Sequence, residues 1–410
     1  MARKDQFVVG LDLGSTKTCA LVCQPGEDGK LQVAGFGEAE SKGWRKSVIV
    51  NLDLSVLALK KAVEAAETAA GISIDSAYVG VGGTHIKGVN SRGAVALAKT
   101  PGATRAVTHD DILKVLQVAR GVTLPQEREI VYPEPQEYVL DSQDGIHNPV
   151  GMSGARLEAN VHLITGSSAA LRNVVTAANL AGIKVLDTVY EPYASAAACL
   201  TADERELGVA LVDIGGGSTD MIVYSQGTVQ HTASIPVGGE HFTNDIAVGL
   251  RTTIPEAERA KRSWSEREPD GNGDAILEVP GVGERPARMV NCSMLSDIIQ
   301  PRTLELLELI EAELERSGHL KQLGAGVVLV GGGAKQGGLA PLAEQTLGLP
   351  VRLGSCKTLE NMGENLAGPE YATLLGLVVY GNRRRLLRDS QEAGLMAKLW
   401  RALRGKGEAT

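Results

Sequence analysis

The chain repeats a short aspartate-led glycine turn at two places that are about half its length apart. The first turn spans residues 12–17 (DLGSTK) and the second spans residues 213–219 (DIGGGST), in a chain of 410 residues. Each turn lies between two short apolar runs, which indicates a strand–turn–strand unit rather than the strand–turn–helix of a P-loop or Rossmann site. The repeat therefore predicts two similar lobes that each contribute one turn to a shared cleft.

The residue types in the two turns suit phosphate and metal binding. Glycine lets the backbone approach a ligand closely, so that its N–H groups converge on phosphate oxygens. A strand-end aspartate can hold hydrated Mg²⁺, and we expect Asp12 and Asp213 to do so through water. One such turn alone is equally compatible with an ordinary hairpin, but two favour a nucleotide site. The residues expected to contact the nucleotide are Asp12, Gly14, Ser15, Thr16 and Lys17 in one lobe and Asp213, Gly215, Gly216, Gly217, Ser218 and Thr219 in the other.

A third glycine cluster ends the apolar run Val327–Val330. Gly331, Gly332 and Gly333 follow this run and precede a predicted helix at 339–347. Adenine and ribose can lie flat against such a turn because no Cβ intrudes. The alternative is a glycine-capped strand in an ordinary α/β core, and for this element alone both interpretations stay open.

Glu191 precedes Pro192 and a run of small residues that predicts a helix starting near this proline. If Glu191 faces the cleft, its carboxylate can orient an attacking water. The alternative is an acidic residue that only stabilises the first turn of the helix. A second helix with small residues, Tyr371–Tyr380, is expected to cross the first one as a hinge between the lobes.

Composition limits the class of protein. At 410 residues the chain is too long for one compact core, and we expect two or more domains. Its net charge of −8 argues against broad nucleic-acid binding. The five scattered cysteines include no CxxC pair and are expected to be reduced, and the seven histidines form no metal-ligand spacing. We expect no signal peptide before the first strand, and no apolar run approaches the ~20 residues that span a bilayer.

The last part of the sequence combines a basic stretch with an amphipathic segment. Residues 383–394 are predicted to be a basic linker, and residues 395–404 place one apolar and one cationic sector on a helix. The apolar sector holds Leu395, Met396, Leu399, Trp400 and Leu403, and the cationic sector holds Lys398, Arg401 and Arg404. This pattern predicts a helix that lies in the interface of an anionic membrane. The alternative is a helix docked into the core of the protein.

These elements, in this order and spacing, resemble the actin-type ATPase fold shared by actin, MreB, heat-shock chaperones and sugar kinases. Within that superfamily the chain is most similar to the FtsA family of bacterial cell-division proteins, over nearly its whole length. The similarity includes an insertion at 84–162, the stretch 279–286 before a helical run, and the amphipathic C-terminal segment. It implies an α/β fold with two actin-like lobes, an inserted small α+β subdomain and a C-terminal amphipathic helix.

The resemblance also divides the chain into subdomains. The expected limits are residues 1–83 and 163–192 for the first lobe, with 368–382 returning to it; 193–234 and 319–367 for the second lobe; 84–162 for the inserted subdomain; and 235–318 for the small subdomain of the second lobe. Gly239, Glu240 and Asn244 are expected to contact the nucleoside where the small subdomain begins. Within that subdomain, residues 262–273 are expected to form a charged loop.

The inserted subdomain has a recognisable local pattern. Thr108 is expected to cap a helix that runs to about Arg120, with two aspartates in its first turn. Strand-like runs are expected at 86–89, 93–97, 129–132 and 137–140. This mixture of strands and one helix is what the resemblance implies for a subdomain that replaces one of those of actin.

The function that the resemblance implies is that of a membrane adaptor. FtsA-like proteins bind ATP with at most slow hydrolysis, polymerise, and hold the tubulin-like FtsZ at the division septum on the cytoplasmic side of the membrane. The inserted subdomain is expected to bind later division proteins. Arg285, Arg288 and Arg302 lie near an amphipathic segment, residues 294–299, which is expected to receive the C-terminal tail of FtsZ. The alternative is a solvated basic rim over an ordinary core helix.

Two other functions share this fold. A PilM-type pilus-assembly adaptor would share the insertion but lack the basic C-terminal helix. A sugar or acetate kinase needs an acceptor pocket with a general base near the transferred phosphoryl group. The sequence offers no second cleft acid beyond Glu191 for that purpose, so the kinase is the weaker alternative.

Overall fold

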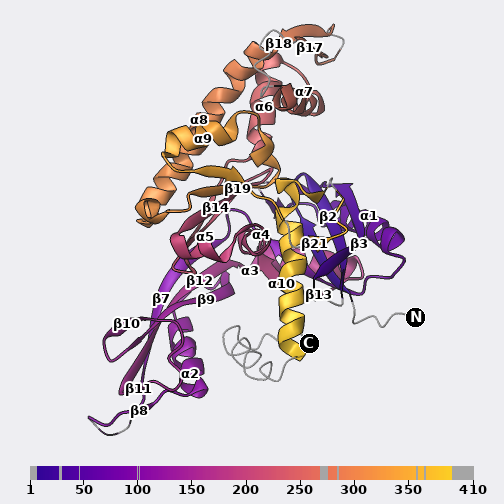
Figure 1. Cartoon of the computed structure of the whole chain (residues 1–410). Coiled ribbons are helices and arrows are strands. Elements are labelled where there is room, and N and C mark those ends of the chain that lie inside the picture. The colour runs from indigo at the N-terminus through magenta and orange to yellow at the C-terminus, as the bar shows by residue number, and fades with distance from the viewer. Residues whose placement is uncertain are drawn as a thin grey trace.

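The computed structural model describes residues 7–26, 30–45, 47–98, 100, 102–267, 276–283, 286–356, 359–363 and 366–389. It consists of two lobes built on separate sheets, with a small subdomain at one end and an inserted subdomain at the other (Figure 1). In this part of the chain, no helix is both long and apolar enough to cross a membrane. The predicted α/β architecture with two lobes and an insertion is confirmed.

The first lobe is built on a six-stranded sheet in the order β13-β6-β1-β2-β3-β21. Three of these strands, β1, β2 and β3, form an antiparallel meander, and the other three are added in parallel. The strands are β1 (Val8–Leu13), β2 (Lys17–Pro25), β3 (Leu31–Glu40), β6 (Ser76–Val81), β13 (Lys184–Tyr190) and β21 (Leu359–Glu360). Apolar residues fill β1 because both faces of the sheet are covered.

Helices α1 (Leu52–Ala70) and α10 (Ala372–Asp389) cover opposite faces of this sheet. The pleat and the strand register turn Gly10 and Gly37 to opposite sides. A Cβ on Gly37 would collide with the backbone of α1, and a Cβ on Gly10 would press against α10. The two glycines therefore let both helices pack close to the strands.

The second lobe repeats the arrangement of the first. Its sheet has the order β16-β15-β14-β19-β20, in which β14, β15 and β16 form an antiparallel meander and β19 pairs with β14 in parallel. Its strands are β14 (Val209–Ile214), β15 (Thr219–Ser225), β16 (Thr228–Ile235), β19 (Val327–Val330) and β20 (Val351–Leu353), and its helices are α4 (Glu191–Cys199), α5 (Ala202–Leu207) and α9 (Leu339–Leu347). Asp12 and Asp213 each lie one residue before the end of the leading strand. The strand–turn–strand prediction is thus confirmed in both lobes.

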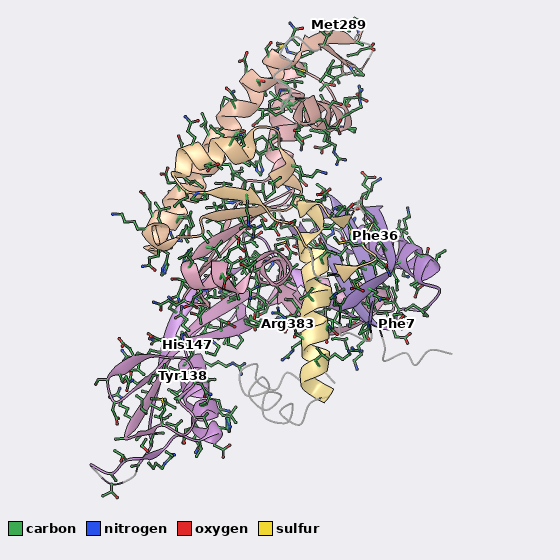
Figure 2. All side chains as sticks on the ribbon, in the orientation of Figure 1. Phe7, Phe36, Tyr138, His147, Met289 and Arg383 are labelled. Carbon is green, nitrogen blue, oxygen red and sulfur yellow. The ribbon has the colours of Figure 1, made fainter. Side chains whose placement is uncertain are left out.

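The small subdomain projects from the second lobe, and Met289 marks its outer tip (Figure 2). It comprises α6 (Gly239–Leu250), α7 (Ile254–Arg267), β17 (Ile276–Val279), β18 (Arg288–Asn291) and α8 (Cys292–Ser317). The prediction of a charged loop at 262–273 is wrong for residues 262–267, which are the last residues of α7. There Arg262 pairs with Glu258 one turn earlier at 2.8 Å, which favours the helix. Residues 268–273 lie outside the described residues.

The inserted subdomain has a core of its own and lies at the opposite end of the molecule from the small subdomain (Figure 1). Its elements are β7 (Lys87–Ala96), β8 (Arg105–Ala106), α2 (His109–Arg120), β9 (Arg128–Leu140), β10 (Gln143–Ile146), β11 (Ser153–Gly154) and β12 (Arg156–Ser167). The helix α2 follows Thr108 as predicted, and Asp111 accepts the backbone N–H of Thr108 at 2.9 Å. This contact between near neighbours explains why the start of α2 could be read from the sequence.

The strand boundaries in the insertion differ from the prediction. The two runs at 86–89 and 93–97 form the single strand β7, and the runs at 129–132 and 137–140 form the single strand β9. β9 continues through Pro133 and Pro135, and at these prolines it pairs with β12 on one edge. On its other edge the short β10 pairs only with the last residues of β9. Proline is tolerated where one edge of a strand is unpaired.

Helix α10 is longer than predicted. The predicted helix ended at Tyr380 and a linker was expected from 383, but residues 383–389 continue α10. Arg384 lies 3.9 Å from the carboxylate of Asp187 in β13, and its guanidinium lies 5.9 Å from the ring of Tyr380. These contacts tie the arginine-rich turn to the first lobe. Residues 390–394 and the predicted amphipathic helix at 395–404 lie outside the described residues.

Candidate functional site

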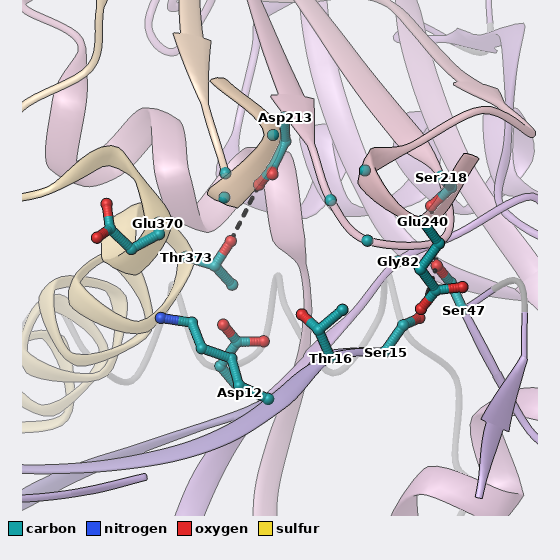
Figure 3. A pocket seen from close by; sticks show the side chains of 18 of the residues that line it. Asp12, Ser15, Thr16, Ser47, Gly82, Asp213, Ser218, Glu240, Glu370 and Thr373 are labelled. Carbon is teal, nitrogen blue, oxygen red and sulfur yellow. Dashed lines mark hydrogen bonds between the residues drawn. The ribbon is translucent and has the colours of Figure 1, made fainter. Parts of the chain in front are cut away.

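The two glycine turns face each other across a cavity of about 830 Å³ between the lobes (Figure 3). Side chains and backbone from both lobes and from the small subdomain line it. The predicted site residues in its wall are Asp12, Gly14, Ser15, Thr16, Lys17, Glu191, Asp213, Gly215, Gly216, Ser218, Gly239, Glu240, Gly331, Gly332 and Gly333. The fold therefore brings most of the predicted site residues to one cleft.

Three residues predicted to bind the nucleotide are not in the cavity wall: Gly217, Thr219 and Asn244. The hydroxyl of Thr219 donates to the carbonyl of Val237 at 2.7 Å, so this buried residue holds β15 to the segment before α6. Asn244 lies on α6 and is exposed. Its predicted contact with a nucleoside gains no support from its position.

The two turns approach each other closely because one of them has no side chain at the contact. A Cβ on Gly216 would lie 2.7 Å from Cγ2 of Thr16 in the other turn. Within the first turn, a Cβ on Gly14 would lie 2.9 Å from the carbonyl oxygen of Lys17. Backbone groups of both turns thus border the same narrow space, as an anion-binding concavity requires.

The third glycine cluster packs against the second turn. Gly331 has a φ of 85°, and a Cβ there would lie 2.4 Å from Oδ1 of Asp213. A Cβ on Gly333 would lie 2.3 Å from Cγ2 of Ile214. A Cβ on Gly332, in contrast, would meet nothing within 4 Å. Packing accounts for the outer two glycines, and Gly332 alone leaves open space in the cleft.

Four carboxyl groups share the interior of the cleft: Asp12, Glu191, Asp213 and Asp220. Burial raises the pKa of Asp12 to about 6 and that of Asp213 to about 7. Burial also raises the pKa of Glu191 well above its usual range, and nearby Asp12, Asp220 and Asp213 add to this shift. Because burying so many negative charges together is costly, these carboxyl groups favour either their protonated forms or a bound cation that offsets their charge.

Asp213 is held in place by hydroxyl groups from two helices. Thr373 near the start of α10 donates to its carboxylate at 3.1 Å (Figure 3). Ser195 in α4 donates to the same carboxylate at 3.3 Å. The two hydroxyl groups are 2.9 Å apart. The aspartate therefore lies where the two helices predicted to form the hinge meet, and these helices pack together.

Lys17 does not extend freely into the cleft. Its Nζ lies 3.4 Å from the ring centroid of Tyr371 and 3.5 Å from Oε2 of Glu38. The hydroxyl of Tyr371 donates to the same carboxylate oxygen at 2.9 Å. The lysine is thus held at the cavity wall by a cation–π contact and an ion pair.

Several residues of the cleft were not predicted from the sequence. They include Glu38, Ser47, Gly82, Asp220, Glu258, Lys261, Lys335, Gln336, Glu370, Tyr371 and Thr373. Lys261 of α7 donates to the carbonyl of Gly239 at 3.0 Å and so joins α7 to the start of α6. Of these residues, Asp220 alone could have been found from the sequence, because it directly follows the second glycine turn. The others are brought to the cleft by tertiary structure.

Two of the three arginines predicted to bind the tail of FtsZ, Arg288 and Arg302, have partners inside the small subdomain. Arg302 in α8 pairs with Asp245 in α6 at 2.7 Å and also contacts Glu305. Arg288 donates to the carbonyl of Leu250. Arg285 lies outside the described residues. The tail-binding role stays a prediction, and any tail would have to compete with these internal contacts.

The described part of the chain has the two-lobed actin-like fold. A chain of the PilM–PilN type IV pilus biogenesis complex matches with a TM-score of 0.62 at 18% identity, covering 92% of this chain and 98% of that one. MreB5 of Spiroplasma citri bound to ADP matches with a TM-score of 0.54 at 13% identity, covering 94% of this chain and 99% of that one. Likeness at this level of identity establishes the fold.

Sequence comparison establishes the family. Residues 210–376 match the family model described as cell division protein FtsA, and residues 83–165 match the SHS2 domain inserted in FtsA. The FtsA protein of Pseudomonas aeruginosa is 41% identical over 93% of this chain and 90% of its own length, and that of Escherichia coli K12 is 37% identical over 93% and 91%. The chain belongs to the FtsA family of cell-division proteins.

Proposed function

We propose that this chain binds ATP with Mg²⁺ between its lobes and acts as a self-assembling adaptor between FtsZ and the cytoplasmic face of the membrane. The observation that best supports the ATP site is the close approach of Gly216 to Thr16, which surrounds one narrow space with backbone from both turns. MreB5 of Spiroplasma citri, which has the same fold, was solved bound to ADP.

The residues of the cleft fit a magnesium-bound triphosphate. Backbone N–H groups of both turns would hold its phosphates, Lys17 would add a positive charge, and Asp12 and Asp213 would hold the metal through water. The buried carboxyl groups support this assignment, because a divalent cation offsets the cost of burying their negative charges. Gly332 would leave space for the nucleoside. When bound, Mg²⁺ would neutralise charge on the phosphates.

Glu191 is the residue proposed to position the attacking water. Its carboxyl group lies in the cavity wall, and its pKa is raised well above the usual range by burial. Burial thus favours the protonated form of this group in the ligand-free cleft, a form that can orient water but cannot accept a proton. This supports ATP hydrolysis that is slow at most.

The adaptor role rests on membership of the FtsA family and on the placement of the subdomains. The small subdomain, proposed to receive the C-terminal tail of FtsZ, lies at the end of the molecule opposite to the last turns of α10 (Figure 1). The proposed membrane helix at 395–404 follows α10 in the sequence. This arrangement would hold FtsZ on the side of the protein that faces away from the membrane.

The inserted subdomain is proposed to bind later division proteins. It has a separate hydrophobic core, is inserted between β6 and β13 of the first lobe, and lies at the far end of the molecule from the small subdomain (Figure 1). Self-assembly of the chain at the septum would combine many weak membrane anchors into stable attachment. With a net charge of −8, the chain is not proposed to bind nucleic acid.

Electron microscopy of negatively stained protein on a lipid monolayer tests this function. With ATP and Mg²⁺ on an anionic monolayer, the protein is expected to form ordered assemblies, and a neutral monolayer is the control. Protein that forms no lipid-bound assemblies under these conditions would contradict the adaptor role.

A further inference from the structure

Ser47 connects the two glycine turns although it belongs to neither. It lies between the short strands β4 (Trp44–Arg45) and β5 (Val48–Ile49) of the first lobe. Its Oγ is 2.9 Å from Oγ of Ser218 in the second turn and 3.5 Å from Oγ of Ser15 in the first. Figure 3 shows the three side chains on the same side of the cleft. This is a direct hydrogen bond between the lobes.

The proton of the Ser47 hydroxyl is committed to Ser218. Ser218 donates its own proton to the carboxylate of Asp220 at 2.8 Å, and a serine hydroxyl has only one proton. The oxygen of Ser218 therefore accepts from Ser47. Asp220 in turn accepts the backbone N–H of Gly83 at 3.1 Å. A hydrogen-bonded chain thus runs from Ser47 across the cleft and back to the first lobe.

The backbone of Ser47 is in an unfavourable conformation. Its φ of 60° lies in the left-handed region, which residues with a Cβ rarely adopt and which is concentrated at functional sites. Gly83 makes room for it, because a Cβ there would lie 2.6 Å from Cβ of Ser47. Glycine at position 47 would avoid this cost. What serine adds at this position is its hydroxyl group.

We propose that Ser47 gives the cleft a preference for a nucleoside triphosphate over a diphosphate, an inference that rests on the proposed ATP site. The Ser47–Ser218 bond lies in the wall of the cleft, where Oγ of Ser15 in the first turn is 3.5 Å from Oγ of Ser47. A phosphate oxygen placed between the turns only accepts hydrogen bonds, so it takes the proton of Ser47 from Ser218. A charge-assisted hydrogen bond then replaces a neutral one, which favours binding. A diphosphate, which is one phosphate shorter, leaves the Ser47–Ser218 bond intact.

Isothermal titration calorimetry with ATP and with ADP, each with Mg²⁺, measures this preference as the ratio of two Kd values. Ser47→Ala removes the hydroxyl and keeps the Cβ, whereas Ser47→Gly removes the hydroxyl and the backbone strain together. In both variants the ratio of the Kd for ADP to the Kd for ATP is expected to fall about fivefold to tenfold, with the Kd for ADP unchanged. Ser225→Ala, at the end of β15 and outside the cavity wall, is the control and keeps the wild-type ratio.

An unchanged ratio in both Ser47 variants overturns the proposal even when nucleotide binding is strong. A ratio that changes in Ser47→Ala but not in Ser47→Gly also overturns it, because the backbone and not the hydroxyl would then be responsible. Failure of the underlying ATP site is a separate result, because wild-type protein would then bind neither nucleotide.

Discussion

The carboxylate of Glu191 occupies the space that a side chain on Gly82 would need. A Cβ built on Gly82 would lie 2.2 Å from Oε2 of Glu191. Gly82 follows β6 in the first lobe, and Glu191 begins α4. This contact keeps the carboxyl group in the wall of the cleft, where an acid that served only the helix dipole would not need to be.

Replacing Gly82 by alanine is expected to displace Glu191. The added methyl group overpacks the site, which costs about 1–3 kcal/mol in the free energy of unfolding. If Glu191 positions water, the rate of ATP hydrolysis is expected to fall about 100-fold, measured as phosphate release in a single turnover. Gly363→Ala is the control, because a Cβ there meets nothing within 4 Å. Phosphate release at the wild-type rate in Gly82→Ala would exclude this role for Glu191.

Asp213 is expected to make the ligand-free protein less stable as the pH rises. Burial raises the pKa of its carboxyl group to about 7, against about 3.9 in an unfolded chain. Below pH ~4 both states hold the proton, so the group costs nothing. Between pH ~4 and pH ~7 the unfolded state loses its proton first, and the free energy of unfolding falls.

Asp213→Asn removes this titration. Relative to wild type, the variant is expected to gain on the order of 2 kcal/mol in the free energy of unfolding between pH ~5 and pH ~8. Urea unfolding without nucleotide or Mg²⁺ at both pH values measures the difference. The same stability difference at both pH values would show that this carboxyl group is already ionised in the free cleft.

Arg302 permits a sharper test of the proposed FtsZ-tail site than charge reversal alone. Its guanidinium pairs with Asp245 at 2.7 Å, so Arg302→Glu removes an internal ion pair together with the proposed docking charge. The double variant Arg302→Asp, Asp245→Arg keeps opposite charges in contact but moves the positive charge. Both are expected to bind a peptide of the FtsZ tail more weakly in a salt-dependent way, measured by fluorescence anisotropy. Unchanged anisotropy would remove Arg302 from the site, and recovery in the double variant would attribute the loss to the internal pair.

Membrane attachment is expected to depend on residues 395–404. Deleting residues 395–410 or changing Trp400 to Glu is expected to release the protein from anionic vesicles and to leave ATP binding unchanged. Each cationic side chain near an anionic leaflet contributes about 1 kcal/mol, so neutral vesicles are the control for the electrostatic part. Sedimentation with vesicles measures the bound fraction. If the truncated protein sediments as fully as the whole chain, the anchor lies elsewhere.

The parts of the fold that could be predicted from the sequence are those with a local signal. The turns at 12–17 and 213–219 bring their own glycines and aspartates, and the cap of α2 at Thr108 needs only neighbouring residues. Such short-range patterns are enough to indicate two lobes and an insertion. They also account for fifteen of the residues that line the cleft, which is fewer than half of them.

The rest depends on contacts between distant segments. Ser47 lies in no motif, and its role follows from its distance to Ser218, 171 positions away. The continuation of α10 beyond Tyr380 is stabilised in part by Arg384 near Asp187, a pairing that the sequence does not reveal. The strand β9 could not be read through its prolines, because their effect depends on which strand edge is paired.

Calorimetric titration of the protein with ATP and Mg²⁺ tests the proposed site most directly. Wild-type protein is expected to bind one ATP per chain. Asp12→Ala and Asp213→Ala are expected to weaken binding because they remove support for the metal, and Gly216→Val is expected to abolish it, since its side chain would fill the space beside Thr16. Equal affinity for ATP in the wild type and all three variants would contradict a nucleotide site between the two turns.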